Sequence, residues 1–76
     1  MNKVIEEKIK VNSQAIKNAK YDRFNELLTL KFKDGKTYSY IGVEPFIFEG
    51  MKQSKSIGSF INKYIIGNEK YYYAYK

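Results

Sequence analysis

The first half of the chain is marked by strand-like alternation of side chains. Over residues 26–32 every second side chain is apolar, which is typical of a β-strand with one face in a core. After the short turn Asp34-Gly35, residues 37–43 predict the returning strand of a hairpin. The apolar positions of the first strand are Leu28, Leu30 and Phe32.

The second half of the chain follows a helical period. Pro45 suits the first turn of a helix, which we expect over residues 46–54. Ser56 is a good N-cap for a second helix, and Gly67 fits the position that ends it. Strands followed by two short helices predict an α+β fold. The apolar stripe of the second helix consists of Ile57, Phe60, Ile61, Tyr64 and Ile65.

Two segments before the hairpin allow either type of element. Residues 1–10 alternate charged and apolar side chains, which fits a strand, but the same apolar residues also line one face of a helix. In residues 13–21, Ser13 could cap a helix whose interior contains poor helix formers. We therefore expect residues 1–10 to form an N-terminal arm or an extra strand. Residues 11–67 form the domain, and the tyrosine-rich tail 68–76 either adds a strand or packs across the sheet.

The register of the hairpin decides where its tyrosines point. A two-residue loop places Lys31 opposite Tyr38, so that the tyrosines share a face with the lysines. A three-residue loop with a glycine bulge places Leu30 opposite Tyr38 and Leu28 opposite Tyr40, and a slip of one residue exchanges the two faces. We favour the three-residue loop because the apolar strand face needs apolar partners.

Composition narrows the chemistry. The 76 residues include no Cys and no His, which excludes disulfides and cysteine-based zinc sites, and the eight acidic residues are scattered. No cofactor is expected. Without a readable pair of nucleophile and base, we also expect no enzymatic activity.

The charge balance suggests the kind of partner. The chain has 14 basic and 8 acidic residues and a net charge of +6, which favours anionic partners, although lysine-rich surfaces also serve solubility. Arg23 is the one arginine. No apolar run has the length needed to cross a membrane, and the first ten residues lack the apolar core of a signal peptide, so a cytoplasmic protein is expected.

An ordered set of residues resembles the KTSC domain family, named for the C-terminal extension of some lysyl-tRNA synthetases. The resemblance implies an antiparallel meander of three strands, or of four, followed by two helices, with a strand in residues 13–21. The family also occurs as small free-standing proteins in bacteria and phages, and RNA binding has been suggested for it. The residues that carry the resemblance are Val11-Asn12-Ser13, Ile16, Tyr21-Asp22, Leu28, Leu30, Phe32, Gly35, Tyr38, Tyr40, Gly42-Val43, Ile47-Phe48-Glu49, Ser56, Gly58 and Asn62.

The candidate ligand-binding residues fall into three groups. Tyr38 and Tyr40 could stack on bases, or pack in the core. The hairpin lysines could contact phosphates, or form a solvated strand face. The start of the second helix could bind an anion, or be a plain N-cap with Gly58 giving clearance to a neighbour. The full set is Lys31, Lys33, Lys36, Tyr38, Tyr40, Ser56, Gly58, Asn62 and Lys63.

These residues predict a non-enzymatic binding module for RNA or single-stranded nucleic acid, with an anionic ligand and no membrane partner. A first alternative is a phage-type protein that sequesters a nucleotide-derived signalling molecule in a pocket completed by a symmetric partner chain, and hence a homo-oligomer. A second alternative is a protein–protein inhibitor or adaptor with Phe24, Phe46 and the tail as aromatic anchors.

Overall fold

The computed structural model describes residues 6–75, and for residues 72–75 it describes the backbone only. Residues 1–5 of the expected N-terminal arm and residue 76 of the tail lie outside the described residues. The elements in chain order are β1 (Glu6–Lys10), β2 (Ile16–Asp22), β3 (Leu27–Phe32), β4 (Thr37–Ile41), α1 (Pro45–Gln53), α2 (Ile57–Tyr64) and β5 (Tyr72–Tyr75).

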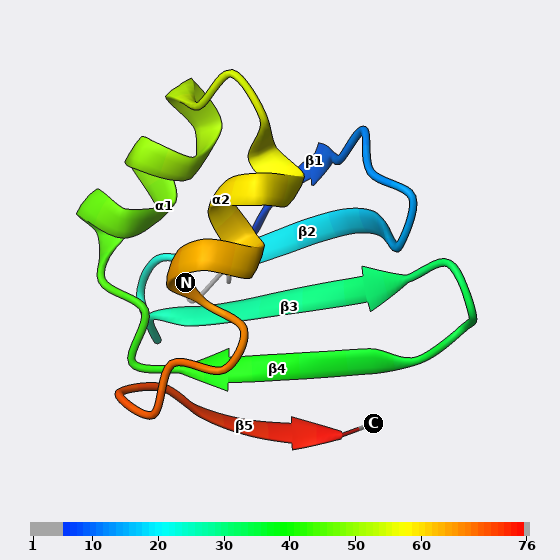
Figure 1. Cartoon of the computed structure of the whole chain (residues 1–76). Helices are drawn as coiled ribbons and strands as arrows, with labels where there is room; N and C mark the ends of the chain where they lie inside the picture. Colours follow the sequence, from blue (N-terminus) through cyan, green and yellow to red (C-terminus); the bar gives the residue numbers. More distant parts are fainter. Residues whose placement is uncertain (1–5, 76) are drawn as a thin grey trace.

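The strands form one antiparallel sheet in the order in which they follow along the chain (Figure 1). This confirms the α+β prediction of an antiparallel meander followed by two helices. Residues 6–10 and 16–21 of the two ambiguous segments are strands, because β1 and β2 pair with each other and β2 pairs with β3. The tail adds β5 to the free edge of β4, so the sheet has five strands rather than the expected three or four.

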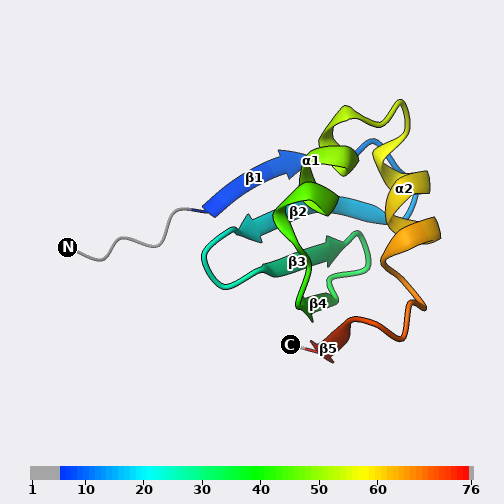
Figure 2. The ribbon, with the colours of Figure 1, turned by 90° about the vertical axis from the view of Figure 1, so that its left-hand side faces the viewer.

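Both helices lie on one face of the sheet, as Figures 1 and 2 show. The alternating side chains of the strands that point to this face are buried with those of α1 and α2. Within residues 6–75, no helix lies on the opposite face of the sheet. The core residues of these elements are Ile16, Ala19, Tyr21, Leu28, Leu30, Tyr40, Phe48, Met51 and Ile61.

The hairpin between β3 and β4 has the three-residue loop that we favoured. Leu28 pairs with Tyr40 and Leu30 with Tyr38. The backbone N–H of Phe32 donates to the carbonyl of Lys36 over 2.8 Å, and Gly35 closes the loop with a positive φ of 96°. The positive φ is a conformation that glycine adopts without strain, so the Asp-Gly turn fixes this register locally.

Tyr21 connects the sheet to α1. Its ring stacks on Phe48 with the centroids 4.4 Å apart, and its hydroxyl donates a hydrogen bond to the carbonyl of Val43, just before the helix. Tyr21 is completely buried, and this burial raises the pKa of its hydroxyl to about 12. The position of α1 on the sheet is therefore set by both packing and a buried hydrogen bond.

Candidate functional site

Four lysines share the face of the sheet that the helices leave uncovered. In β1–β3, Ala19 and Leu30 point into the core, so the residues that alternate with them point to the other side. Exposed Glu6 of β1 and Ile41 of β4 lie on this side too, and we call the exposed lysines placed there by the alternation the lysine face. It consists of Lys8 and Lys10 on β1, Lys20 on β2 and Lys31 on β3.

Strand pairing brings these charges together. Lys8 lies directly opposite Lys20, and Lys10 and Lys31 lie on either side of Asn18. Like charges that face each other across two strands destabilise a sheet. Lys20 has a distant ion pair with Glu6 (Nζ–Oε1 3.6 Å), whereas no described carboxylate lies within 4 Å of the other three lysines. The lysine face therefore concentrates positive charge at some cost to the fold.

The rows of the sheet continue the lysine face with hydroxyl groups. Lys20 pairs with Thr29, which in turn pairs with Ser39 on β4. The two hydroxyls are 3.0 Å apart and hydrogen-bonded to each other. Ser39 is only 3% exposed and Thr29 is half-buried, so these two hydroxyls bond to each other within the sheet and offer little open surface to a ligand.

Arg23 and Lys52 form an ion-pair network with Glu7 and Glu49 outside the lysine face. Arg23, in the turn after β2, contacts Glu7 (2.8 Å) and Glu49 (2.7 Å), while Lys52 contacts the same two carboxylates at 3.1 and 3.4 Å. The Arg23 hydrogen bonds are the main cause that lowers the pKa of both carboxyls. This network joins β1, the turn and α1, so Arg23 has a structural environment and does not belong to the lysine face.

The structure separates the hairpin residues predicted to bind a ligand. Lys31 belongs to the lysine face, and Lys33 and Lys36 are exposed at the adjoining end of the hairpin. Tyr38 and Tyr40 lie on the helix-facing side, where Tyr40 is only 6% exposed and Tyr38 packs edge-on against a neighbouring phenylalanine ring. The three-residue loop therefore places the tyrosines and Lys31 on opposite faces of the sheet, and they do not form one binding surface.

The residues predicted at the start of α2 have local structural contacts. The Ser56 hydroxyl accepts a hydrogen bond from the backbone N–H of Ser59 (3.2 Å), which is an N-cap. Gly58 is buried against Ser13, and a Cβ placed on it would lie 2.9 Å from the Ser13 Cβ. The Asn62 amide donates to the Gly58 carbonyl over 3.1 Å. These contacts agree with the capping and clearance roles considered from the sequence.

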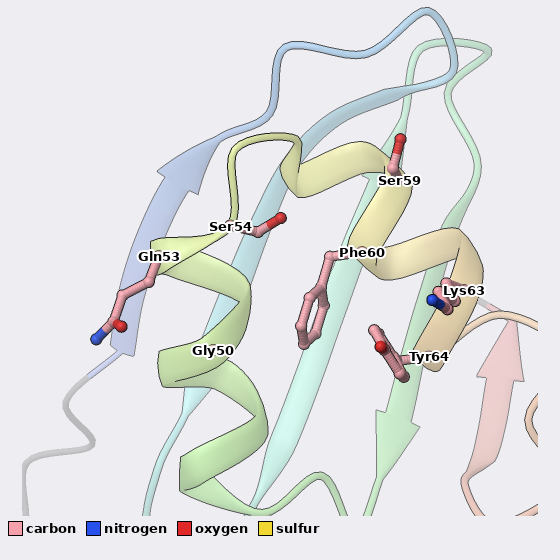
Figure 3. A pocket seen from close by; sticks show the side chains of 7 residues that line it. All are labelled: Gly50, Gln53, Ser54, Ser59, Phe60, Lys63 and Tyr64. Atoms are coloured by element: carbon pink, nitrogen blue, oxygen red, sulfur yellow. The ribbon is translucent and has the colours of Figure 1, made fainter.

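Lys63, also predicted, lies at an open groove between α1 and α2 with a volume of about 410 Å³ (Figure 3). Its ammonium lies 5.3 Å from the ring centre of Tyr64, and the Tyr64 and Phe60 rings are in contact. The residues that line the groove are Gly50, Gln53, Ser54, Ser59, Phe60, Lys63 and Tyr64.

Sequence reasoning did not find Lys8, Lys10 and Lys20. The sequence does contain the pattern that places them on one face, because these lysines alternate with Ile9 and Ala19 as in a half-buried strand. This pattern can be interpreted only when residues 6–10 and 16–22 are known to be strands. Across residues 6–75, no helix is both long and apolar enough to cross a membrane.

The sequence and the fold match known proteins. The profile of the KTSC domain family matches residues 12–71. A protein from Tsukamurella paurometabola is 40% identical over 52 residues, which cover 68% of this chain and 78% of that protein. A lysine–tRNA ligase from Nostoc punctiforme is 32% identical over 63 residues, which cover 83% of this chain and 11% of the ligase.

Among solved structures, the crystal structure of a KTSC domain protein from Yersinia pestis superposes with a TM-score of 0.77 and 28% sequence identity. The superposition covers 92% of this chain and 96% of that protein. The family profile spans most of the chain, and the Yersinia domain shares nearly its whole fold. The chain therefore belongs to the KTSC domain family.

Proposed function

We propose that the protein is a non-enzymatic binding module for RNA or single-stranded nucleic acid, and that it binds through the lysine face. The observation that carries the proposal is the pairing of Lys8 directly opposite Lys20 on an uncovered sheet surface. A sheet that places like charges opposite each other gains stability when an anion lies between them. A phosphate backbone supplies such anions at regular intervals.

The expected binding is mainly electrostatic. Each phosphate that a lysine neutralises releases counterions, and four such contacts with a single strand give a slope of log K against log salt of about −3. Lys33 and Lys36, at the end of the hairpin, extend the positive surface beyond Lys31. Because the one arginine lies in the Glu7–Glu49 network, bidentate reading of guanine is not expected, and the sequence preference should be weak.

The proposal can be tested by fluorescence anisotropy with labelled RNA and DNA strands of about 20 nucleotides between about 25 and 200 mM salt. Phosphate contacts lose most of their affinity over such a range of salt concentration. The double substitution Lys10→Gln and Lys31→Gln removes two charges of the lysine face. It should reduce the salt slope by about 1.4 and weaken binding at every sequence tested.

A matched control removes two lysines that lie outside both the lysine face and the groove between α1 and α2, Lys55→Gln and Lys70→Gln. This control variant has the same net charge as the test variant, so a loss confined to Lys10→Gln and Lys31→Gln locates binding on the sheet. Equal losses in both variants would show attraction by net charge alone, and negligible binding of either nucleic acid at low salt would refute the proposal.

A second candidate function is that of a protein–protein adaptor. Phe24 is 91% exposed and Phe46 is 62% exposed. Phe24 follows Arg23 in the chain, Phe46 lies three residues before Glu49 on α1, and Arg23 and Glu49 form an ion pair. Large aromatic side chains with this exposure are typical anchors of interfaces. Substitution of Phe24 and Phe46 by Ser should leave the melting temperature nearly unchanged but remove partner proteins from cross-linked complexes in cells. Retention of the same complexes would exclude this function.

A further inference from the structure

The groove between α1 and α2 lies on the helix layer, away from the lysine face, and has its own chemistry. It is an open surface groove of about 410 Å³, so a ligand bound there would keep part of its surface in solvent. Figure 3 shows Phe60 and Tyr64 side by side on the α2 wall, with Gly50 on the α1 wall. We infer that this groove binds a small aromatic anion of the size of a nucleoside monophosphate.

The aromatic wall is held in place before any ligand arrives. The ring centres of Phe60 and Tyr64 are 4.6 Å apart, with their planes tilted by 48°. The tip of Phe60 rests on α1, because Gly50 has no side chain and an added Cβ would touch the ring at 3.5 Å. Tyr64 is nevertheless 44% exposed. A planar base stacks on such a ring without displacing a core residue.

The charge of the groove selects an anionic ligand. Lys63 is the one charged side chain among the residues that line it, and no carboxylate lines it. Within residues 6–75 no carboxylate lies within 4 Å of the Lys63 ammonium. Of the polar side chains drawn in Figure 3, the Ser54 hydroxyl points toward the Phe60 side of the groove, whereas the Gln53 amide and the Ser59 hydroxyl point away from it. The Lys63 ammonium lies over the Tyr64 ring, so a base that stacks there takes the place of the ammonium, which then turns to the phosphate of the same ligand.

The test uses the whole chain labelled with ¹⁵N and titrated with AMP, adenosine and inorganic phosphate, with amide shifts followed by NMR. AMP should give saturable shifts at Gly50, Phe60 and Tyr64. It should bind about two- to fivefold more tightly than adenosine, the difference expected for one exposed charge pair. Inorganic phosphate should not shift these amides. Shifts confined to the lysine face, or none at all, would overturn the inference.

Two variants separate the contributions. Tyr64→Leu keeps an apolar side chain but removes the stacking surface, and it should weaken AMP binding about five- to 100-fold. Lys63→Gln should abolish the difference between AMP and adenosine, while Lys55→Gln, a lysine outside the groove, should not. Unchanged AMP affinity in Tyr64→Leu would overturn the inference. Amide shifts at the groove with an acidic phenylalanine-containing peptide, but none with AMP, would overturn it as well. The nucleic-acid proposal stands or falls separately, because its test variant Lys10→Gln and Lys31→Gln leaves Lys63 and Tyr64 unchanged.

Discussion

Two helical glycines should respond to alanine in opposite ways. Gly58 lies in the first turn of α2, and a Cβ added there would be 2.9 Å from the Cβ and 3.2 Å from the Oγ of Ser13. Ser13 cannot withdraw freely, because its hydroxyl accepts hydrogen bonds from the backbone N–H groups of Ala15 (3.2 Å) and Ile16 (3.3 Å). The loop before β2 would therefore have to shift to admit a methyl group.

The size of the effect follows from two opposing contributions. Replacing glycine by alanine in a helix stabilises it by about 1 kcal/mol. Overpacking of a buried contact costs about 1–3 kcal/mol. For Gly58→Ala we expect a net loss of about 1 kcal/mol in the free energy of unfolding, which lowers the melting temperature of a domain this small by about 4–8 °C.

Gly50 provides the matched control within the same fold. It lies inside α1, and its added Cβ would meet the Phe60 ring at 3.5 Å, an ordinary contact distance. Gly50→Ala keeps the helix-propensity gain without the clash. It should raise the free energy of unfolding by up to about 1 kcal/mol.

Both variants can be measured by thermal and urea unfolding followed by circular dichroism. The double variant Ser13→Gly with Gly58→Ala removes the Cβ that causes the clash. It should therefore be more stable than the sum of the two single effects predicts. The reasoning is refuted if Gly58→Ala is as stable as Gly50→Ala, or if Ser13→Gly and Gly58→Ala are strictly additive.

Three further predictions concern buried and ionised groups. Tyr21→Phe leaves the Val43 carbonyl without its hydrogen bond and should cost about 1–3 kcal/mol in urea unfolding, whereas Tyr64→Phe, at an exposed ring, should change stability by less than about 0.5 kcal/mol. The pKa of Tyr21 is raised to about 12, whereas that of an unfolded tyrosine is about 10. The stability that Tyr21 gives to the fold is therefore complete below about pH 10 and is lost between about pH 10 and 12. The loss of stability in alkali should be smaller in Tyr21→Phe. The pKa of Glu7 is lowered in the fold, chiefly by its hydrogen bond with Arg23, so Glu7 stabilises the fold above about pH 4.5 and this stabilisation is lost as the pH falls further. Melting temperatures measured between about pH 2 and 7 should therefore depend less on acid in Arg23→Met than in the parent protein.

Much of the fold could be predicted because its signals are local. The Asp-Gly turn and the apolar positions of β3 specify the hairpin and its register within ten residues. The period of α2 and the Ser56 cap specify that helix in the same way. By contrast, β1 is a short charged segment whose pattern suits a strand or a helix equally, and only its pairing with β2 decides. Local patterns cannot report a partner strand that lies elsewhere in the chain.

The candidate sites were harder to predict than the fold. The lysine face combines three strands, so it depends on the register of β1 on β2 as well as on the hairpin. Lys31 was found because it lies in the hairpin, and the other members were missed because they do not. The groove exists only because the two helices lie side by side. Among its lining residues, the sequence predicted a ligand-binding role for Lys63 alone, whereas Phe60 and Tyr64 were predicted only as part of an apolar helix face.

The sequential order of the strands also bears on how the chain folds. The connections before β2, β3 and β4 are residues 11–15, 23–26 and 33–36, so the first four strands form from hairpins with short loops. The pairing of β4 with β5 must instead close over residues 42–71, which include both helices. Closure of a long loop costs entropy before its contacts form. We therefore expect β5 to join last during refolding, and its amides to exchange hydrogen before those of β3, at the centre of the sheet.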